Sequence, residues 1–181
     1  KIYYMEGYLA ASPTGLAAAL KGRQVAQEAG VALALTLSDV SMIQFCKGGL
    51  DAMLGDGVDY LFCNLEEAQV WCGTEDLEAI RASLKKMAKM VCLTRGPDGS
   101  EILTADASCH VPAEKVKAID TNGAGDMFAG AFLYAITRGH SPEQAASLGN
   151  HAAAAVVSQH GNRLTLGQLS AIKAYALPPL K

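Results

Sequence analysis

Short apolar segments alternate with longer helix-like segments along the chain, and this alternation is the feature that most constrains the fold. Residues 2–5, 31–36 and 58–62 are short and apolar, as buried strands are. A helix is predicted between the cap at Ser12 and the stop at Gly30, and residues 41–54 carry apolar side chains near the helical period. Because parallel strands need crossovers and helices supply them, the order predicts an α/β fold with a mostly parallel sheet and helices on both faces.

The same alternation continues beyond the third predicted strand. Residues 65–72 predict a short helix, and Thr74 is predicted to cap a second helix that reaches about Met87. Residues 90–94 and 100–104 flank a Gly-Pro-Asp-Gly turn, which predicts a strand pair. A last helix is predicted after the capping signal Ser141-Pro142-Glu143-Gln144.

A glycine-rich run, Asp120-Thr121-Asn122-Gly123-Ala124-Gly125-Asp126, separates the apolar residues 116–119 from a helix predicted over residues 127–136. A glycine-rich turn that opens a helix gathers unpaired backbone N–H groups and the positive end of the helix dipole at one point. That combination predicts a site for an anion, with Asp126 beside it as a possible base.

Composition limits the classes of partner. The chain has 181 residues, of which 50% are hydrophobic and 18% charged, so we expect one globular domain over residues 1–181. The net charge of −3 gives no basic surface for nucleic acid or an anionic membrane. The five cysteines are scattered and lack metal-site spacing, and no apolar run approaches the roughly 18 residues of a membrane span. We therefore expect buried free thiols and a cytoplasmic protein.

Three polar groups of residues are expected at strand ends. They are Asn64 with Glu67, the turn from Thr94 to Gly99, and the run from Asp120 to Asp126. Ligands of open α/β sheets sit outside the carboxyl ends of the strands. We therefore expect the three groups to converge on one crevice.

These residues resemble the signatures of a known family. The run from Asp120 to Asp126 and the helix after it resemble the C-terminal signature of the ribokinase-like (PfkB) family of carbohydrate and nucleoside kinases. Residues 64–67 resemble the Asn-x-x-Glu motif of the family, and residues 94–99 resemble its Thr-x-Gly-x-x-Gly turn. The similarity extends through residues 149–154 to Gly161. Three motifs in the family's order make the resemblance specific.

The resemblance implies ATP-dependent phosphorylation of a hydroxyl group, usually a CH₂OH. Asp126 would remove the proton of the acceptor hydroxyl, and an anion hole at Gly123, Ala124 and Gly125 would hold the charge that develops on the phosphoryl group. This assignment agrees with the chemistry, because phosphoryl transfer needs positioning and charge neutralisation more than covalent catalysis.

The resemblance also implies ATP and Mg²⁺ as cofactors. Glu67 would orient Mg²⁺ through water, and Asn64 would lie near the ATP phosphates. The nucleotide would be contacted by Thr94, Gly96 and Gly99, with Asn150 on the adenine side. Some relatives bind a monovalent cation such as K⁺, and the matching positions are Asp120, Asn122, Val156, Gln159, Gly161 and Thr165.

The acceptor is a small molecule whose identity the motifs leave open. Residues 4–12 and 35–39 are more similar to the adenosine-kinase branch, so a nucleoside such as adenosine ranks first and a ribose- or fructose-type sugar second. In the family, a β-sheet lid and much of the acceptor site belong to an N-terminal half with no counterpart here. We therefore expect that half to be missing and this chain alone to be poorly active. A homodimer is also expected.

Each group of residues has a plainer interpretation. A glycine turn before a helix is often only a turn, and Asp126 would then be a cap. Asn64 is a common strand terminator, and Glu67 stabilises a first helical turn without any ligand. For Asn150 the plainer interpretation is a surface or packing residue. A relative that binds nucleotide without turnover is the remaining alternative for the whole chain.

Overall fold

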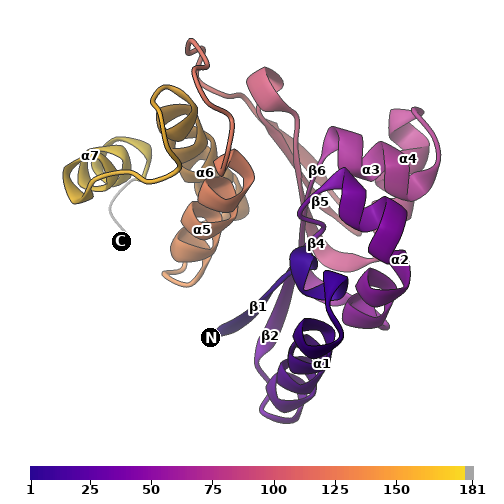
Figure 1. The fold of residues 1–181 in the computed structure, drawn as a ribbon. Helices are drawn as coiled ribbons and strands as arrows, with labels where there is room; N and C mark the ends of the chain where they lie inside the picture. Colours follow the sequence, from indigo (N-terminus) through magenta and orange to yellow (C-terminus); the bar gives the residue numbers. More distant parts are fainter. Residues whose placement is uncertain (178–181) are drawn as a thin grey trace. The chain divides into compact units, whose positions relative to one another are not determined.

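The computed structural model describes residues 1–177 and has an α/β architecture with a mixed six-stranded sheet in the order β1-β2-β3-β4-β5-β6 (Figure 1). The strands are β1 (Ile2–Glu6), β2 (Ala32–Thr36), β3 (Val58–Asn64), β4 (Ala88–Thr94), β5 (Ser100–Thr104) and β6 (Ser108–Val111). The first three strands pair in parallel, with Leu35 opposite Leu61, as their helical crossovers require. The α/β prediction is therefore confirmed.

The helices follow the capping signals of the sequence in most places. They are α1 (Pro13–Glu28), α2 (Val40–Leu54), α3 (Leu65–Cys72), α4 (Leu77–Leu84), α5 (Ala124–Ile136), α6 (Pro142–Val157) and α7 (Leu166–Ala176), with short 3₁₀ helices η1 (Gly7–Ala11) and η2 (Gly96–Asp98). The Ser12 side chain accepts a hydrogen bond from Gly15 N, and Ser141 and Gln144 form a reciprocal capping box. Helix α7 was not predicted.

Two local predictions are wrong. Helix α4 is capped by Asp76, whose side chain accepts from Glu78 N, and not by Thr74, whose hydroxyl accepts from Asp76 N two residues before the helix. The helix ends at Leu84 and not near Met87. Residues 112–123, which include the apolar residues before the glycine-rich run, contain no helix or strand. Val116 and Ile119 are about half exposed there, so their apolar character does not reflect a buried strand.

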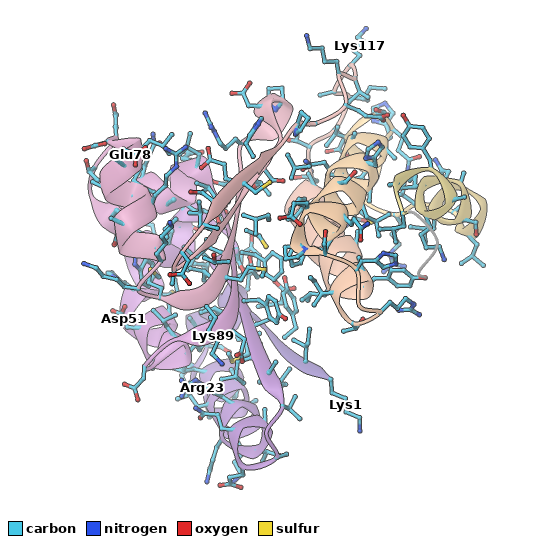
Figure 2. All side chains as sticks on the ribbon, turned by 180° about the vertical axis from the view of Figure 1, so that it is seen from behind. Lys1, Arg23, Asp51, Glu78, Lys89 and Lys117 are labelled. Atoms are coloured by element: carbon cyan, nitrogen blue, oxygen red, sulfur yellow. The ribbon has the colours of Figure 1, made fainter. Side chains whose placement is uncertain are left out.

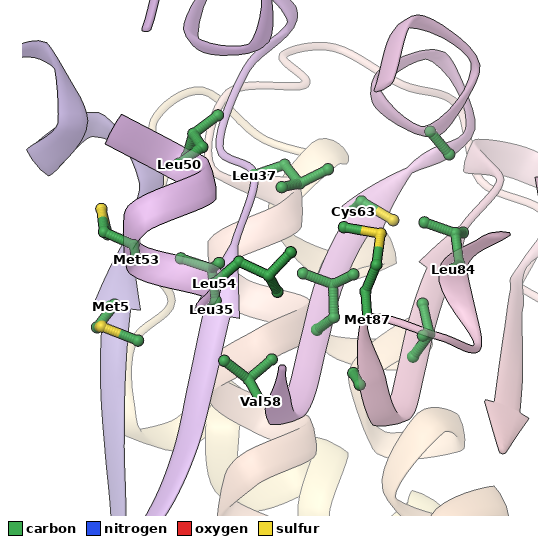
Figure 3. Close-up of a cluster of buried hydrophobic side chains, with 14 of the residues drawn as sticks. Met5, Leu35, Leu37, Leu50, Met53, Leu54, Val58, Cys63, Leu84 and Met87 are labelled. Atoms are coloured by element: carbon green, nitrogen blue, oxygen red, sulfur yellow. The ribbon is translucent and has the colours of Figure 1, made fainter. Parts of the chain in front are cut away.

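The chain divides into two compact units. The first comprises Lys1–Leu93 and Leu103–Ser108. Its core is built on the parallel strands and on the helices α1 to α4 that follow them (Figure 3). Met5, Leu35 and Leu61 are fully buried in this core.

The second unit comprises Thr94–Ile102 and the residues from Cys109 onward. Helices α5 and α6 pack on each other, with Phe128 and Phe132 buried and their ring centroids 6.1 Å apart. A Cβ atom at Gly149 would lie 2.7 Å from the Phe128 ring, so the glycine lets the two helices approach closely. Within residues 1–177, no helix has the length and apolar character needed to cross a membrane.

Many charged side chains are exposed, with Glu67 and Glu101 buried. Asp51, Glu78 and Lys117 extend outward from the ribbon (Figure 2). The cysteines are all free thiols, but only Cys63 and Cys92 are buried, which corrects the expectation that all are. Burial raises the pKa of both buried thiols well above the ordinary value, so neither is a ready nucleophile.

Candidate active site

The boundary between β3 and α3 places Asn64 and Glu67 against each other. Asn64 Oδ1 accepts from Glu67 N at 2.8 Å, while Asn64 N donates to Glu67 Oε2 at 3.0 Å. Asn64 Nδ2 also donates to Glu67 Oε1 at 2.7 Å. The two residues therefore form a capping box that starts α3 and fixes the carboxylate at the carboxyl end of a parallel strand.

The environment of Glu67 favours its protonated form. The side chain is only 5% exposed, and burial raises its pKa from the ordinary value of 4.5 to about 7. The carboxylates of Asp39 and Glu66 act in the same direction, and the hydrogen bond from Asn64 N opposes them. A nearby cation would stabilise the ionised form of this buried carboxyl group.

The raised pKa of Glu67 predicts a specific pH dependence of stability. Between pH 4.5 and about 7 the folded chain keeps a proton on Glu67 that the unfolded chain releases, so stability falls as the pH rises through this window. This pKa shift corresponds to a loss of about 3 kcal/mol in the free energy of unfolding across the window. We expect Glu67→Gln to remove this loss, as measured by urea unfolding at several pH values without Mg²⁺.

The matched control is Glu66→Gln, which removes an exposed carboxylate from the same helical turn. Its free energy of unfolding should keep most of the wild-type pH dependence, because burial is the main cause of the raised pKa of Glu67 and the charge of Glu66 is a smaller one. Identical pH dependence in wild type and Glu67→Gln would contradict the raised pKa.

The turn after β4 is closed by its own backbone. Arg95 N donates to Gly99 O at 2.7 Å, and Gly99 N donates to Gly96 O at 3.1 Å. Gly96 and Gly99 have φ values of +56° and +91°, which favour glycine. A Cβ atom at Gly99 would lie 2.1 Å from Val111 O, so the backbone of the turn and that of β6 are in direct contact. Thr94 ends β4 at the base of this turn.

Asn150 is tied to the same neighbourhood from α6. Its side chain is 4% exposed, and Nδ2 donates to Val111 O at 2.9 Å and to Pro112 O at 3.2 Å. The amide nitrogen therefore holds the backbone that contacts Gly99. Contact of Asn150 with the adenine stays a prediction.

The glycine-rich run leads into helix α5, and the capping of this helix differs from that of the other helices. Among the seven described α-helices, it alone begins without a side-chain cap, because its N-cap is Gly123 in the left-handed conformation with φ +76°. Ala124, Gly125 and Asp126 form the first turn. Ala124 N donates to Thr121 O at 3.3 Å, whereas Gly125 N and Asp126 N have no acceptor within the described residues. Gly125 and Asp126 are exposed. An external anion would therefore find free donors and a carboxylate side by side.

The loop after α6 approaches this run. The carboxylate of Asp120 accepts from Asn122 N at 3.0 Å and from Gly161 N at 3.3 Å, and these hydrogen bonds lower its pKa below the ordinary value. A Cβ atom at Gly123 would lie 2.7 Å from Asn162 Cβ. The structure thus brings Asp120, Asn122 and Gly161 together.

The other residues predicted for a monovalent cation have different surroundings. Val156 is fully buried, Gln159 bonds to Arg163 O and to Gln168, and Thr165 caps α7. Residues 1–177 contain no group of three His, Cys, Asp or Glu side chains that would hold a metal ion on its own.

The sequence reasoning missed one charged pair in this region. Arg95 Nη1 lies 2.5 Å from Glu101 Oε1, and the Glu101 side chain is only 4% exposed. The available signal was a glutamate inside an otherwise strand-like segment, residues 100–104. The structure places Asn64 and Glu67 in the first unit and the other predicted site residues in the second. Their convergence on one crevice stays a prediction.

Known proteins share this fold and sequence pattern. A family model described as pfkB family carbohydrate kinase matches residues 1–168. The adenosine kinase of Schizophyllum commune is 28% identical over 180 residues, covering 89% of this chain and 52% of that protein.

Two solved structures give the same picture. The adenosine kinase of Sinorhizobium meliloti matches with a TM-score of 0.91 and 31% identity, over 97% of this chain and 54% of that one. A probable sugar kinase from Rhizobium etli CFN 42 matches with a TM-score of 0.91 and 34% identity, over 98% and 55%. The chain thus spans about half the length of these relatives.

Proposed function

Because the chain belongs to the pfkB family of carbohydrate kinases, we propose that it carries the phosphoryl-transfer part of an ATP-dependent kinase whose acceptor is a hydroxymethyl group of a nucleoside or sugar. The observation that carries the proposal is the uncapped start of α5. The other six described α-helices are capped by a side-chain oxygen, whereas α5 offers the unpaired N–H groups of Gly125 and Asp126 beside the exposed Asp126 side chain. Donors without a protein partner at a helix start favour a phosphate group.

In this proposal Asp126 accepts the proton of the acceptor hydroxyl. The N–H groups at the start of α5, from the N-cap Gly123 to Asp126, stabilise the charge that spreads over the transferred phosphoryl oxygens. Glycine at positions 123 and 125 lets the substrate approach the main chain closely. The chain supplies position and charge, which are the main requirements of phosphoryl transfer.

ATP is the proposed phosphoryl donor and Mg²⁺ its partner. Asn64 and Glu67 would face the metal, and the turn with Thr94, Gly96 and Gly99 would contact the nucleotide. A buried carboxylate with a raised pKa fits a role beside a cation, and the absence of a three-residue metal cluster within residues 1–177 fits a metal held largely by phosphates and water. When bound, Mg²⁺ neutralises phosphate charge.

Adenosine is the first acceptor to test. Relatives of this chain include adenosine kinases, and one similar structure is that of a probable sugar kinase. The experiment measures ADP release from Mg·ATP with a panel of adenosine, other nucleosides, ribose and fructose. It uses the natural protein that contains these 181 residues, with the 181-residue chain assayed in parallel.

We expect phosphorylation of a nucleoside by the natural protein and little turnover by the 181-residue chain alone, where water would enter the site. Turnover with sugars only would identify a ribose- or fructose-type sugar, and not a nucleoside, as the acceptor. Tight binding of Mg·ATP without turnover on any acceptor would contradict the kinase proposal and favour a nucleotide-binding role.

The proposal includes a monovalent cation beside the glycine-rich run. The low pKa of Asp120 keeps a negative charge there, and its contact with Gly161 brings the two loops together. Replacement of K⁺ by tetramethylammonium in the same assay should slow turnover. An unchanged rate would remove the cation from the proposal.

A further inference from the structure

The turn between β4 and β5 is flanked by an ion pair with no role in the proposed chemistry. Arg95 begins the turn and Glu101 lies in β5, and their side chains meet at 2.5 Å. Glu101 is 4% exposed and Arg95 25% exposed in their side chains, so both charges have lost most of their water. The attraction between two buried charges offsets the free-energy cost of removing them from water only when their geometry is well fixed.

The pair spans the same residues that the backbone closes. Arg95 N donates to Gly99 O, and Asp98 N donates to Arg95 O at 3.2 Å. Glu101 follows Gly99 by two residues, so the side-chain contact adds a second link between the entry and the exit of the turn. Movement of Arg95 would strain both links.

The pair is poorly designed for stability alone. Arg95 Nε and the hydroxyl of Ser100, both buried, have no hydrogen-bond partner among the described residues. Unsatisfied buried polar groups lower the stability of the fold. A protein in which apolar side chains replace a buried ion pair is often as stable or more stable. A contribution to the shape of the turn accounts for charged residues here better than a contribution to the core does.

We propose that the Arg95–Glu101 ion pair is a positioning pair that holds the turn from Arg95 to Gly99 in its nucleotide-binding shape before ATP arrives. The inference rests on the proposed function, in which this turn contacts the nucleotide. If loss of the pair leaves the binding shape populated about a tenth of the time, the apparent affinity for Mg·ATP falls about tenfold.

The test uses Glu101→Gln, Arg95→Lys and the charge-exchanged double variant Arg95→Glu/Glu101→Arg in the natural protein. Glutamine keeps the size and a hydrogen-bonding oxygen but removes the charge, and lysine keeps the charge but not the planar fork. The matched control is Asp59→Asn, which removes the ion pair between Asp59 and Lys89, 2.7 Å apart in the first unit.

Two measurements separate the inference from the proposed function. Hydrogen exchange at the amides of Arg95, Asp98 and Gly99 reports the turn without ligand, and calorimetric titration with Mg·ATP reports binding. Both are made at a temperature where every variant is folded. We expect at least tenfold faster exchange and about tenfold weaker binding in both single variants, with partial recovery in the double variant and neither change in Asp59→Asn.

Each outcome has a definite meaning. Unchanged exchange and unchanged binding in Glu101→Gln, with normal binding by wild type, would overturn the positioning role and leave the proposed function intact. Faster exchange without loss of affinity would show that the pair only stabilises the hairpin, and would also overturn it. Failure of the wild-type protein to bind Mg·ATP would overturn the proposed function itself.

Discussion

Replacing Asp126 with asparagine should lower the turnover of the natural protein by about 10²- to 10⁴-fold, which is the usual effect of removing a general base. Asparagine keeps the shape of the side chain in the first turn of α5 but cannot take the proton of the acceptor hydroxyl. The N–H groups of the turn remain, so affinity for Mg·ATP should change by less than about threefold, because these donors and not the base hold the phosphoryl group. Steady-state ADP release and calorimetric titration measure the two quantities.

The control for Asp126→Asn is Glu143→Gln, which removes an acidic side chain from the first turn of α6. It tests the general effect of deleting a helix-start carboxylate, and turnover should stay near wild type. Turnover of Asp126→Asn within about tenfold of wild type would rule out Asp126 as the base, because general-base loss costs at least 10²-fold. The residue would then be a first-turn acid that only favours the helix.

Gly99→Ala should destabilise the chain by about 3 kcal/mol or more. Two effects add at this position. The φ of +91° with ψ −138° is a conformation that residues with a side chain avoid, and the new Cβ atom would lie 2.1 Å from Val111 O, a backbone atom that cannot move away as a flexible side chain would. The turn or β6 must move, so the variant should also weaken Mg·ATP binding. Urea unfolding measures the first effect and calorimetry the second.

Gly96→Ala is the matched control, because it lies in the same turn with φ +56° but meets no atom within 4 Å. It should cost only about 1 to 2 kcal/mol, which is the usual penalty of the left-handed conformation. Equal destabilisation by the two substitutions would contradict the steric account and leave backbone conformation as the sole cause.

Local signals in the sequence predicted much of the fold. The capping box at Ser141 and the cap at Ser12 were predicted because the side chains that fix each helix start lie three positions from their partners. The capping box between Asn64 and Glu67 has the same spacing but was not predicted. The cap of α4 was misassigned because Thr74 and Asp76 are both good caps two residues apart, and only the structure shows which oxygen reaches the first turn.

Contacts between distant residues were not predictable. The partners of Asn150 lie 38 and 39 residues earlier in the chain, and no pattern in α6 announces them. The approach of Gly161 to Asp120 spans 41 residues and became an expectation only through the family resemblance. Glu101 was missed because a buried charge in a strand acquires meaning only from Arg95 across the turn.

The capping box at the start of α3 has a consequence for how the candidate residues arise during folding. Asn64 and Glu67 find each other across three residues, so their arrangement forms as soon as one helical turn does. The start of α5 lies instead against Asn162, much later in the chain, and bringing two distant segments together has a larger entropic cost. Under mild denaturation the start of α5 should therefore loosen while the Asn64–Glu67 capping box at the start of α3 persists. Turnover would then be lost before the helix content falls.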